Sequence, residues 1–199
     1  MVESIWRKGK LFGFMLLAGI LLMAKPALAD SYYPYEIQGY DVTVKVGKDN
    51  VYHVTERLQV NFNQARHGIY RDIPVINNVS REDGSTSRIQ ARVTNIKTYG
   101  EKKTVGREGS YCRIQLGDEN KTLVGEHMYR ISYDYNMGKD VRKGEDEFYY
   151  NIIGTSWDTT IQNVTFHIMM PEDIDESKVG MAYGESGSTN NEGLQYTIN

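Results

Sequence analysis

The segment HGIYRDIP, residues 67–74, brings a histidine, an arginine and an aspartate together over a short length of chain. Such side chains transfer protons in catalytic sites and bind oxyanions in recognition sites. If the segment is extended, Ile69, Arg71 and Ile73 share one face and Asp72 lies on the other, because side chains alternate along a strand. Arg71 therefore either reaches out to a ligand or is buried against a partner inside the fold.

A second charged residue shares a face with apolar ones in the segment HVTERLQVNF, where Glu56 falls in the same row as Val54 and Leu58. A buried carboxylate without a partner is costly, and an arginine can bind a carboxylate through two parallel hydrogen bonds. We therefore predict a structural ion pair between Glu56 and Arg71. Such a pair fixes strand register, since a one-residue slip would leave both charges without a partner.

Four further residues are candidates for binding. Trp157 next to Asp158 is typical of a sugar-stacking site, although a core tryptophan at a corner, with Asp158 capping a turn, is the favoured interpretation. Asp72 remains a candidate because it lies on the phase opposite to Arg71. His67 is expected to be a loop residue or a donor to nearby backbone.

No catalytic residue, metal site or cofactor is predicted. The four histidines lack zinc-ligand spacing, and the acidic runs at 145–147 and 172–176 lack the spacing of a calcium loop. Cys112, the only cysteine, is in phase with Ile114 and is expected to be a buried, inert thiol. The fifteen tyrosines are expected to cover sheet surfaces with their hydroxyl groups at the wet edge.

The N-terminus has the layout of a secretory signal peptide, which we predict to span residues 1–29. Basic residues precede an uncharged run of 13 residues at 11–23, and Ala27 and Ala29 are suited to cleavage before Asp30. A membrane-spanning helix needs about 20 residues, so a retained anchor is the rival interpretation. Cleavage changes the formal net charge from −3 to −6, because it removes four basic residues and one acidic one. This balance argues against nucleic acid or anionic lipid as the main partner.

Period-two alternation dominates the remaining residues, 30–199, and predicts an all-β domain. The pattern indicates a hairpin of 42–46 and 54–62 around the turn GKDN, and a strand from Ile89 that breaks phase near Ile96 at a bulge. Further strands are predicted at 112–116, 129–135, 148–154, 164–170 and 194–198. About eight short strands favour an antiparallel β-sandwich, Ig-like in general architecture, behind an N-terminal signal helix.

Five segments in order resemble the domain of unknown function family 2207, predicted membrane proteins of bacteria and archaea, over residues 40–171. They are YDVTVKVGKDNVYHVTERLQVNF, HGIYRDIP, RIQLGD, MYRISYDY and DEFYYNIIGTSWDTTIQNVTFHIMMP. Residues that match the family pattern are Glu56, Gly68, Arg71, Asp72, Pro74, Gly117, Asp118, Trp157 and Asp158. Asn50 departs from it, because the family often has glycine there, but asparagine tolerates positive φ.

The resemblance implies a signal peptide, this extracytoplasmic domain and then transmembrane helices, so the chain is expected to stop before those helices. It implies no catalytic assignment. Our first hypothesis is an exported module at the outer face of the cell membrane that binds cell-wall polymer or another surface protein. A hydrolase of envelope carbohydrate that uses Asp and Glu pairs is the alternative, and a structural spacer is a third hypothesis.

Overall fold

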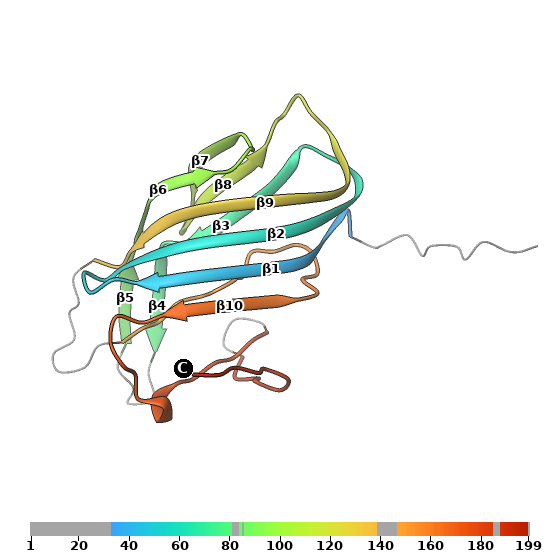
Figure 1. The fold of residues 1–199 in the computed structure, drawn as a ribbon. Helices are drawn as coiled ribbons and strands as arrows, with labels where there is room; N and C mark the ends of the chain where they lie inside the picture. The colour runs from blue at the N-terminus through green and yellow to red at the C-terminus, as the bar shows by residue number, and fades with distance from the viewer. Residues whose placement is uncertain (1–32, 81–83, 85, 139–146, 185–187, 199) are drawn as a thin grey trace, which may run out of the picture. The chain divides into compact units, whose positions relative to one another are not determined.

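The structure is a computed structural model that describes residues 33–80, 84, 86–138, 147–184 and 188–198. Within these residues the chain forms ten strands in three sheets and one short 3-10 helix (Figure 1). The predicted all-β antiparallel sandwich is confirmed. The predicted signal peptide, residues 1–29, lies outside the described residues.

The larger sheet has five strands in the order β10-β1-β2-β9-β6. Their bounds are Val164–Met169 for β10, Tyr35–Val46 for β1, Val51–Arg66 for β2, Leu123–Asn136 for β9 and Arg92–Thr98 for β6. All neighbours in this sheet are antiparallel except β1 and β10, which are parallel. The predicted antiparallel sandwich therefore includes one parallel pair, at this edge of the larger sheet.

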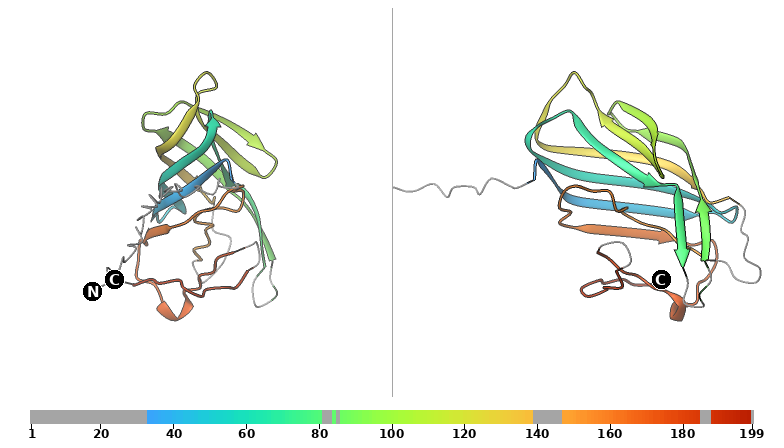
Figure 2. Two further views of the ribbon diagram at one scale, coloured as in Figure 1. Left: turned by 90° about the vertical axis from the view of Figure 1, so that its right-hand side faces the viewer. Right: turned by 180° about the vertical axis from the view of Figure 1, so that it is seen from behind.

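A second sheet has three strands in the order β3-β8-β7, and β4 and β5 form a separate hairpin. Their bounds are Gly68–Pro74 for β3, Ile76–Ser80 for β4, Thr86–Gln90 for β5, Lys103–Glu108 for β7 and Tyr111–Gly117 for β8; the helix η1 is Glu176–Lys178. Seen from behind, β3 and β8 form a second layer in front of β2 and β9 (Figure 2).

The β1–β2 hairpin forms where the alternation predicts it, around residues 47–50. The Gly47 N–H donates to the Val51 carbonyl at 2.8 Å and closes the turn. Asn50 has φ = 60°, so the asparagine that departs from the family pattern adopts the left-handed conformation that glycine would otherwise supply.

The core lies between the two layers, because the alternating apolar residues of both sheets point toward each other. Buried side chains from β1, β2, β3, β8 and β9 form a single cluster. Its fully buried members include Tyr40, Val42, Leu58, Val60, Ile114, Leu116, Tyr129 and Ile131. Burial of these side chains is the main favourable contribution to folding, at about 1.5–3 kcal/mol for each large aliphatic residue.

Two predicted strands are wrong. Residues 148–154 pack Phe148, Tyr150 and Ile152 against the core but form no ladder, so their alternation reflects burial without strand pairing. Residues 194–198 also form no strand, and Tyr196 is 49% exposed. Alternation specifies which side chains are buried, whereas a strand also needs a neighbour for its backbone groups.

The strand predicted from Ile89 is split in two. β5 ends at Gln90 and β6 begins at Arg92, so the chain changes sheet at the buried Ala91. The break of phase near Ile96 corresponds to a register shift between Thr94 and Lys97, so the predicted bulge is confirmed. β4 and β7 were not predicted, because polar residues dominate them.

Two glycines let β3 and β8 come together at their ends. Gly68 and Gly117 are register partners with φ of 137° and 142°. A Cβ on Gly68 would overlap the Leu116 carbonyl, and a Cβ on Gly117 would overlap the His67 carbonyl just before β3. Arg71 and Asp72 lie on the same strand, after Ile69 and Tyr70, so this close approach helps to position the polar residues of β3. None of the described residues forms a helix with the length and apolar character that crossing a bilayer needs.

Candidate functional site

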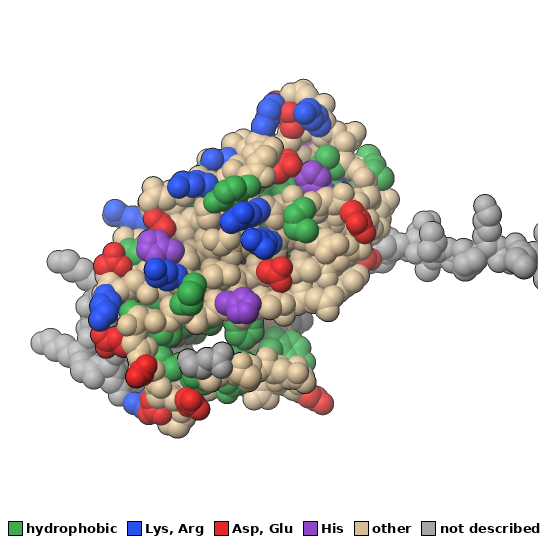
Figure 3. Space-filling view, in the orientation of Figure 1, with side chains coloured by type: hydrophobic (Ala, Val, Ile, Leu, Met, Phe, Trp, Pro, Cys, Tyr) green, Lys and Arg blue, Asp and Glu red, His purple; other side chains and the backbone are tan. Residues whose placement is uncertain are grey.

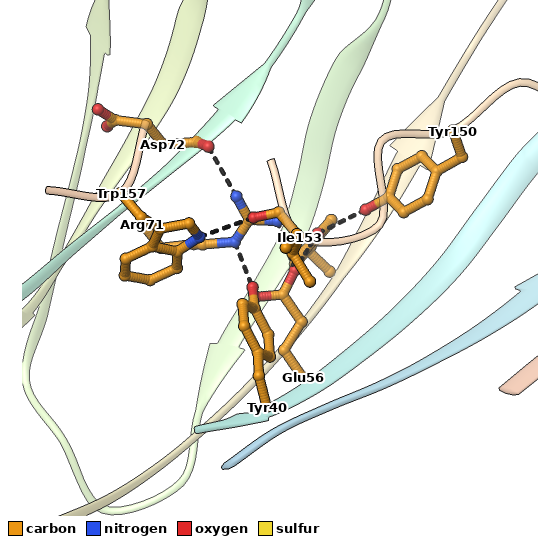
Figure 4. Close-up of polar contacts among 8 residues, drawn as sticks. Tyr40, Glu56, Arg71, Asp72, Tyr150, Ile153 and Trp157 are labelled. Carbon is orange, nitrogen blue, oxygen red and sulfur yellow. Dashed lines mark hydrogen bonds and ion pairs between the residues drawn. The ribbon is translucent and has the colours of Figure 1, made fainter. Parts of the chain in front are cut away.

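The structure brings Glu56 of β2 and Arg71 of β3 together in the middle of the core (Figure 4). The Arg71 Nε and Nη2 atoms donate to the two carboxylate oxygens of Glu56, each at 2.9 Å. Glu56 is 0% exposed and Arg71 is 1% exposed. In the sheet, Glu56 lies between Val42 of β1 and Ile131 of β9, so the carboxylate has apolar neighbours on both sides. Without its partner this charge would be strongly unfavourable.

Tyrosine hydroxyl groups complete the coordination of Glu56. Tyr40 donates to Oε2 at 2.7 Å and Tyr133 donates to Oε1 at 2.6 Å, while the hydroxyl groups of Tyr133 and Tyr150 are 2.8 Å apart. Burial, and then the negative charge of Glu56, raise the pKa of Tyr133 well above its ordinary value. Tyr133 therefore stays protonated and acts as a donor. The expectation of hydroxyl groups at a wet edge is wrong for these buried tyrosines.

The rest of the Arg71 guanidinium group is also occupied. Its Nη1 donates to the Asp72 carbonyl oxygen at 2.7 Å, and the Trp157 ring lies 5.9 Å from its Cζ. A Cβ on Gly154 would come within 2.8 Å of Nη1, so glycine is needed for the chain to pass the guanidinium group. Burial lowers the pKa of Arg71, but the Glu56 carboxylate outweighs it and the net pKa is raised. Arg71 is therefore a structural cation, buried and held by three hydrogen bonds to Glu56 and Asp72.

Asp72 points the other way, as its phase predicts, and Figure 4 shows its carboxylate turned away from Arg71. Arg113, its register partner on β8, donates to both carboxylate oxygens at 2.8 Å. The Arg113 guanidinium also lies over the Tyr70 ring, 5.0 Å from its centroid. The hydrogen bond to Asp72 raises the pKa of Arg113. Asp72 is thus held in one orientation by a partly exposed arginine.

A pocket of about 150 Å³ opens beside this second ion pair. It is lined by Tyr35, Arg66, Gly68, Ile69, Tyr70, Asp72, Arg113, Ser156 and Asp158. The segment after Asp158 joins the edge of β1, where the Thr159 hydroxyl donates to the Tyr35 carbonyl and the Ile37 N–H donates to the Thr160 carbonyl. This pairing places the exposed Asp158 at the pocket, because it anchors the two residues that follow Asp158 to Tyr35 and Ile37.

Two pocket groups keep free hydrogen-bonding capacity. Asp158 accepts the Tyr35 hydroxyl on Oδ1 at 2.6 Å, and no described residue bonds to its Oδ2. Arg66 lies over the Tyr35 ring, 5.6 Å from its centroid, and no carboxylate among the described residues is within ion-pair distance of it. The pocket therefore offers a cation and an acceptor oxygen on a wall that Tyr35 holds in place.

Residues 36–199 match the family described as predicted membrane protein (DUF2207) N-terminal domain. The chain belongs to this family. The match extends the resemblance of residues 40–171 to the end of the chain. The Escherichia coli protein named "Uncharacterized protein YciQ" is 23% identical over 186 residues, which cover 88% of this chain and 29% of that protein. The chain thus spans less than a third of the length of this curated relative.

Solved structures give only partial likenesses to this DUF2207 domain. The M1 zinc metallopeptidase of Deinococcus radiodurans matches at 14% identity with a TM-score of 0.32, over 51% of this chain and 20% of that one. Leukotriene A4 hydrolase of Saccharomyces cerevisiae matches at 7% identity with a TM-score of 0.32, over 55% and 18% respectively. At such TM-scores we draw no conclusion from either likeness.

The remaining predicted site residues of the DUF2207 domain fall into two groups. Asp72 and Asp158 line the pocket together. Trp157 does not line it, because its ring packs against Arg71 and Tyr40, and its indole N–H donates to the Ile153 carbonyl at 2.7 Å. His67 is exposed, and its Nδ1 bonds to the Lys121 carbonyl at 2.9 Å.

Sequence reasoning missed the two arginines of the pocket. Arg113 alternates with Cys112 and Ile114 and looks like an ordinary exposed strand residue, since its pairing with Asp72 depends on the β3–β8 register. Arg66 lies at the end of β2, where a polar residue is ordinary and gives no signal of a site.

Among the described residues, no group of three or more His, Cys, Asp or Glu side chains could hold a metal ion.

Proposed function

We propose that this chain is an exported binding or assembly module, held at the outer face of the cell membrane by other parts of a longer protein. The observation that carries the proposal is the pocket in which Arg66 and Asp158 remain free to bind while their neighbours are fixed. Membership of a family of predicted membrane proteins supports the membrane location, and the predicted signal peptide supports the outer face.

The fixed neighbours give the pocket a rigid wall. Asp72 is tied to Arg113 by two hydrogen bonds, and Gly68 is fixed by the close approach of β3 and β8. A preorganised wall favours recognition, because little conformational freedom is lost on binding. Beneath it, the buried ion pair of Glu56 and Arg71 joins β3 to β2 of the larger sheet.

The dimensions of the pocket indicate the kind of ligand. Its volume of about 150 Å³ is below the roughly 300–1,000 Å³ of sites that enclose a drug-sized molecule. It suits one polar end or branch of a larger partner, with an anionic or hydroxyl group at Arg66 and a donor group at Asp158. We therefore propose cell-wall polymer or another surface protein as the partner, rather than a free metabolite.

One observation favours a second candidate function, hydrolysis of envelope carbohydrate. Asp72 and Asp158 line the same pocket, and glycoside hydrolysis uses two facing carboxyl groups. The ion pair with Arg113 speaks against it, because the two hydrogen bonds from Arg113 occupy both carboxylate oxygens of Asp72.

The test is retention of the purified protein on isolated cell-wall material and on co-extracted surface proteins. We expect Arg66→Ala and Asp158→Ala each to lower retention by about tenfold or more, the value of one lost charge-assisted hydrogen bond. Arg88→Ala on the exposed face of β5 is the matched control and should bind normally. Full retention by both pocket variants would contradict the proposal. Release of soluble sugar that Asp158→Asn abolishes would favour hydrolysis instead.

A further inference from the structure

Two arginines face each other directly on the outward face of the five-stranded sheet. Arg57 of β2 and Arg130 of β9 are register partners, and both are exposed. Asp41 is the partner of Arg57 on β1, and the Tyr99 N–H donates to the Arg130 carbonyl at 3.2 Å. One row across the sheet therefore runs from Asp41 through the two arginines to Tyr99.

This juxtaposition is unfavourable for the isolated protein. Like charges directly opposite each other on neighbouring strands destabilise a sheet. In the part of the chain that the structure describes, neither guanidinium group lies within ion-pair distance of a carboxylate, although Asp41 is adjacent in the row. The Arg130 guanidinium instead lies over the Tyr99 ring, 4.3 Å from its centroid. An oxyanion between Arg57 and Arg130 would remove the repulsion and accept hydrogen bonds from both.

The adjacent row adds polar donors and a third cation. Thr43, Thr55, Ser132 and Lys97 are successive register partners across β1, β2, β9 and β6. Figure 3 shows Lys and Arg side chains gathered near the middle of this face, beside an exposed hydrophobic group. The surface thus combines cations, hydroxyl groups and an aromatic ring on an open sheet.

We propose that this surface, Arg57, Arg130, Lys97 and Tyr99 with the hydroxyl row, binds an acidic polysaccharide of the cell envelope. Its carboxylate or phosphate groups lie between Arg57 and Arg130, a sugar ring packs on Tyr99, and the hydroxyl row bonds to neighbouring sugars. The hydroxyl row and the exposed Tyr99 ring beside the two arginines are groups that bond to and pack on sugars, which favours an acidic polysaccharide over other anions. A local pair of arginines suits a polymer with spaced charges.

This inference rests on the proposed function for its location in the envelope, but it uses residues that do not line the pocket. The two sites can therefore be tested separately. Binding should weaken with salt, because the arginines are exposed and their attraction to the polymer is screened.

The test is binding of the purified protein to immobilised alginate, a polymer with one carboxylate on each sugar, and to neutral dextran. The double variant Arg57→Gln/Arg130→Gln should lose at least about tenfold in alginate affinity. Arg88→Gln should retain it, and Asp41→Asn should bind more tightly, because it removes a nearby negative charge. The double variant should unfold at the same temperature as the parent protein or a higher one.

Three outcomes would overturn the inference. They are equal binding to dextran, full alginate binding by the double variant, or arginine-dependent binding to phosphatidylglycerol vesicles without binding to alginate. Arg66→Ala separates the two sites, because it should keep alginate binding even where it loses retention on whole cell-wall material. Loss of alginate binding in Arg66→Ala alone would assign the acidic polymer to the pocket instead.

Discussion

Replacing Arg71 by methionine should destabilise the fold severely, because it leaves the Glu56 carboxylate buried without its cation. Methionine keeps much of the side-chain volume, so the effect reports the lost charge more than a cavity. Glu56 would retain only the hydroxyl groups of Tyr40 and Tyr133 as donors. Breaking a fully buried pair in this way costs about 3–5 kcal/mol.

That loss is a large fraction of the roughly 5–15 kcal/mol that holds a typical domain together. The ratio of folded to unfolded protein should therefore fall by about two to four orders of magnitude. Urea denaturation followed by tryptophan fluorescence measures it, since Trp157 packs against Arg71. The midpoint should fall while the slope with urea stays the same.

Two further variants make the result specific. Adding Glu56→Gln to Arg71→Met should recover about 1–3 kcal/mol, because the orphaned charge is removed. Lys48→Met breaks the exposed ion pair with Glu172 and should leave the midpoint unchanged. If Arg71→Met were as stable as the parent protein, the structural role of the pair would be refuted.

Three other changes have distinct expected outcomes. Tyr133→Phe should cost about 1–2 kcal/mol at neutral pH through the lost hydrogen bond. Burial raises the folded-state pKa of Tyr133, so its contribution to stability is fully present below pH about 10 and is lost as the pH rises further. Above that pH, the free energy of unfolding should fall with pH less steeply in Tyr133→Phe than in the parent protein, with slopes that differ by about 1.4 kcal/mol per pH unit. Equal slopes would contradict the assignment. Gly154→Ala should lower the unfolding temperature of the protein more than Gly138→Ala does. Both glycines have φ near 80°, but only the methyl group at position 154 would press against Arg71. Equal losses would show that contact to be unimportant. Gly68→Ala should prevent folding, because its methyl group would overlap the backbone of β8, and soluble, folded protein would refute this.

The sequence could predict the sheet wherever alternation and pairing agree. The β1–β2 hairpin satisfies both, because its apolar rows face the core and the turn at 47–50 joins direct neighbours. At 148–154 the apolar side chains are buried but the backbone has no strand partner. At Ala91 the alternation of apolar and polar residues continues, although the chain passes there from one sheet to another. The alternation alone does not predict this change of sheet.

The candidate site was predictable in one part for a similar reason. Glu56 and Arg71 are each a charge in an otherwise apolar row, so each signals a partner within its own chain. Arg66 and Arg113 are polar residues at positions where polar residues are ordinary. Their relation to Asp72 and Asp158 depends on which strands become neighbours and on the loop that returns to β1.

Retention on cell-wall material by Arg66→Ala and Asp158→Ala, beside Arg88→Ala, tests the central claim of a binding pocket most directly. The account predicts that the parent protein and Arg88→Ala are retained, and that the two pocket variants are retained about tenfold less while unfolding at the parent's urea midpoint. Equal retention of all four proteins, or no retention of the parent, would contradict it.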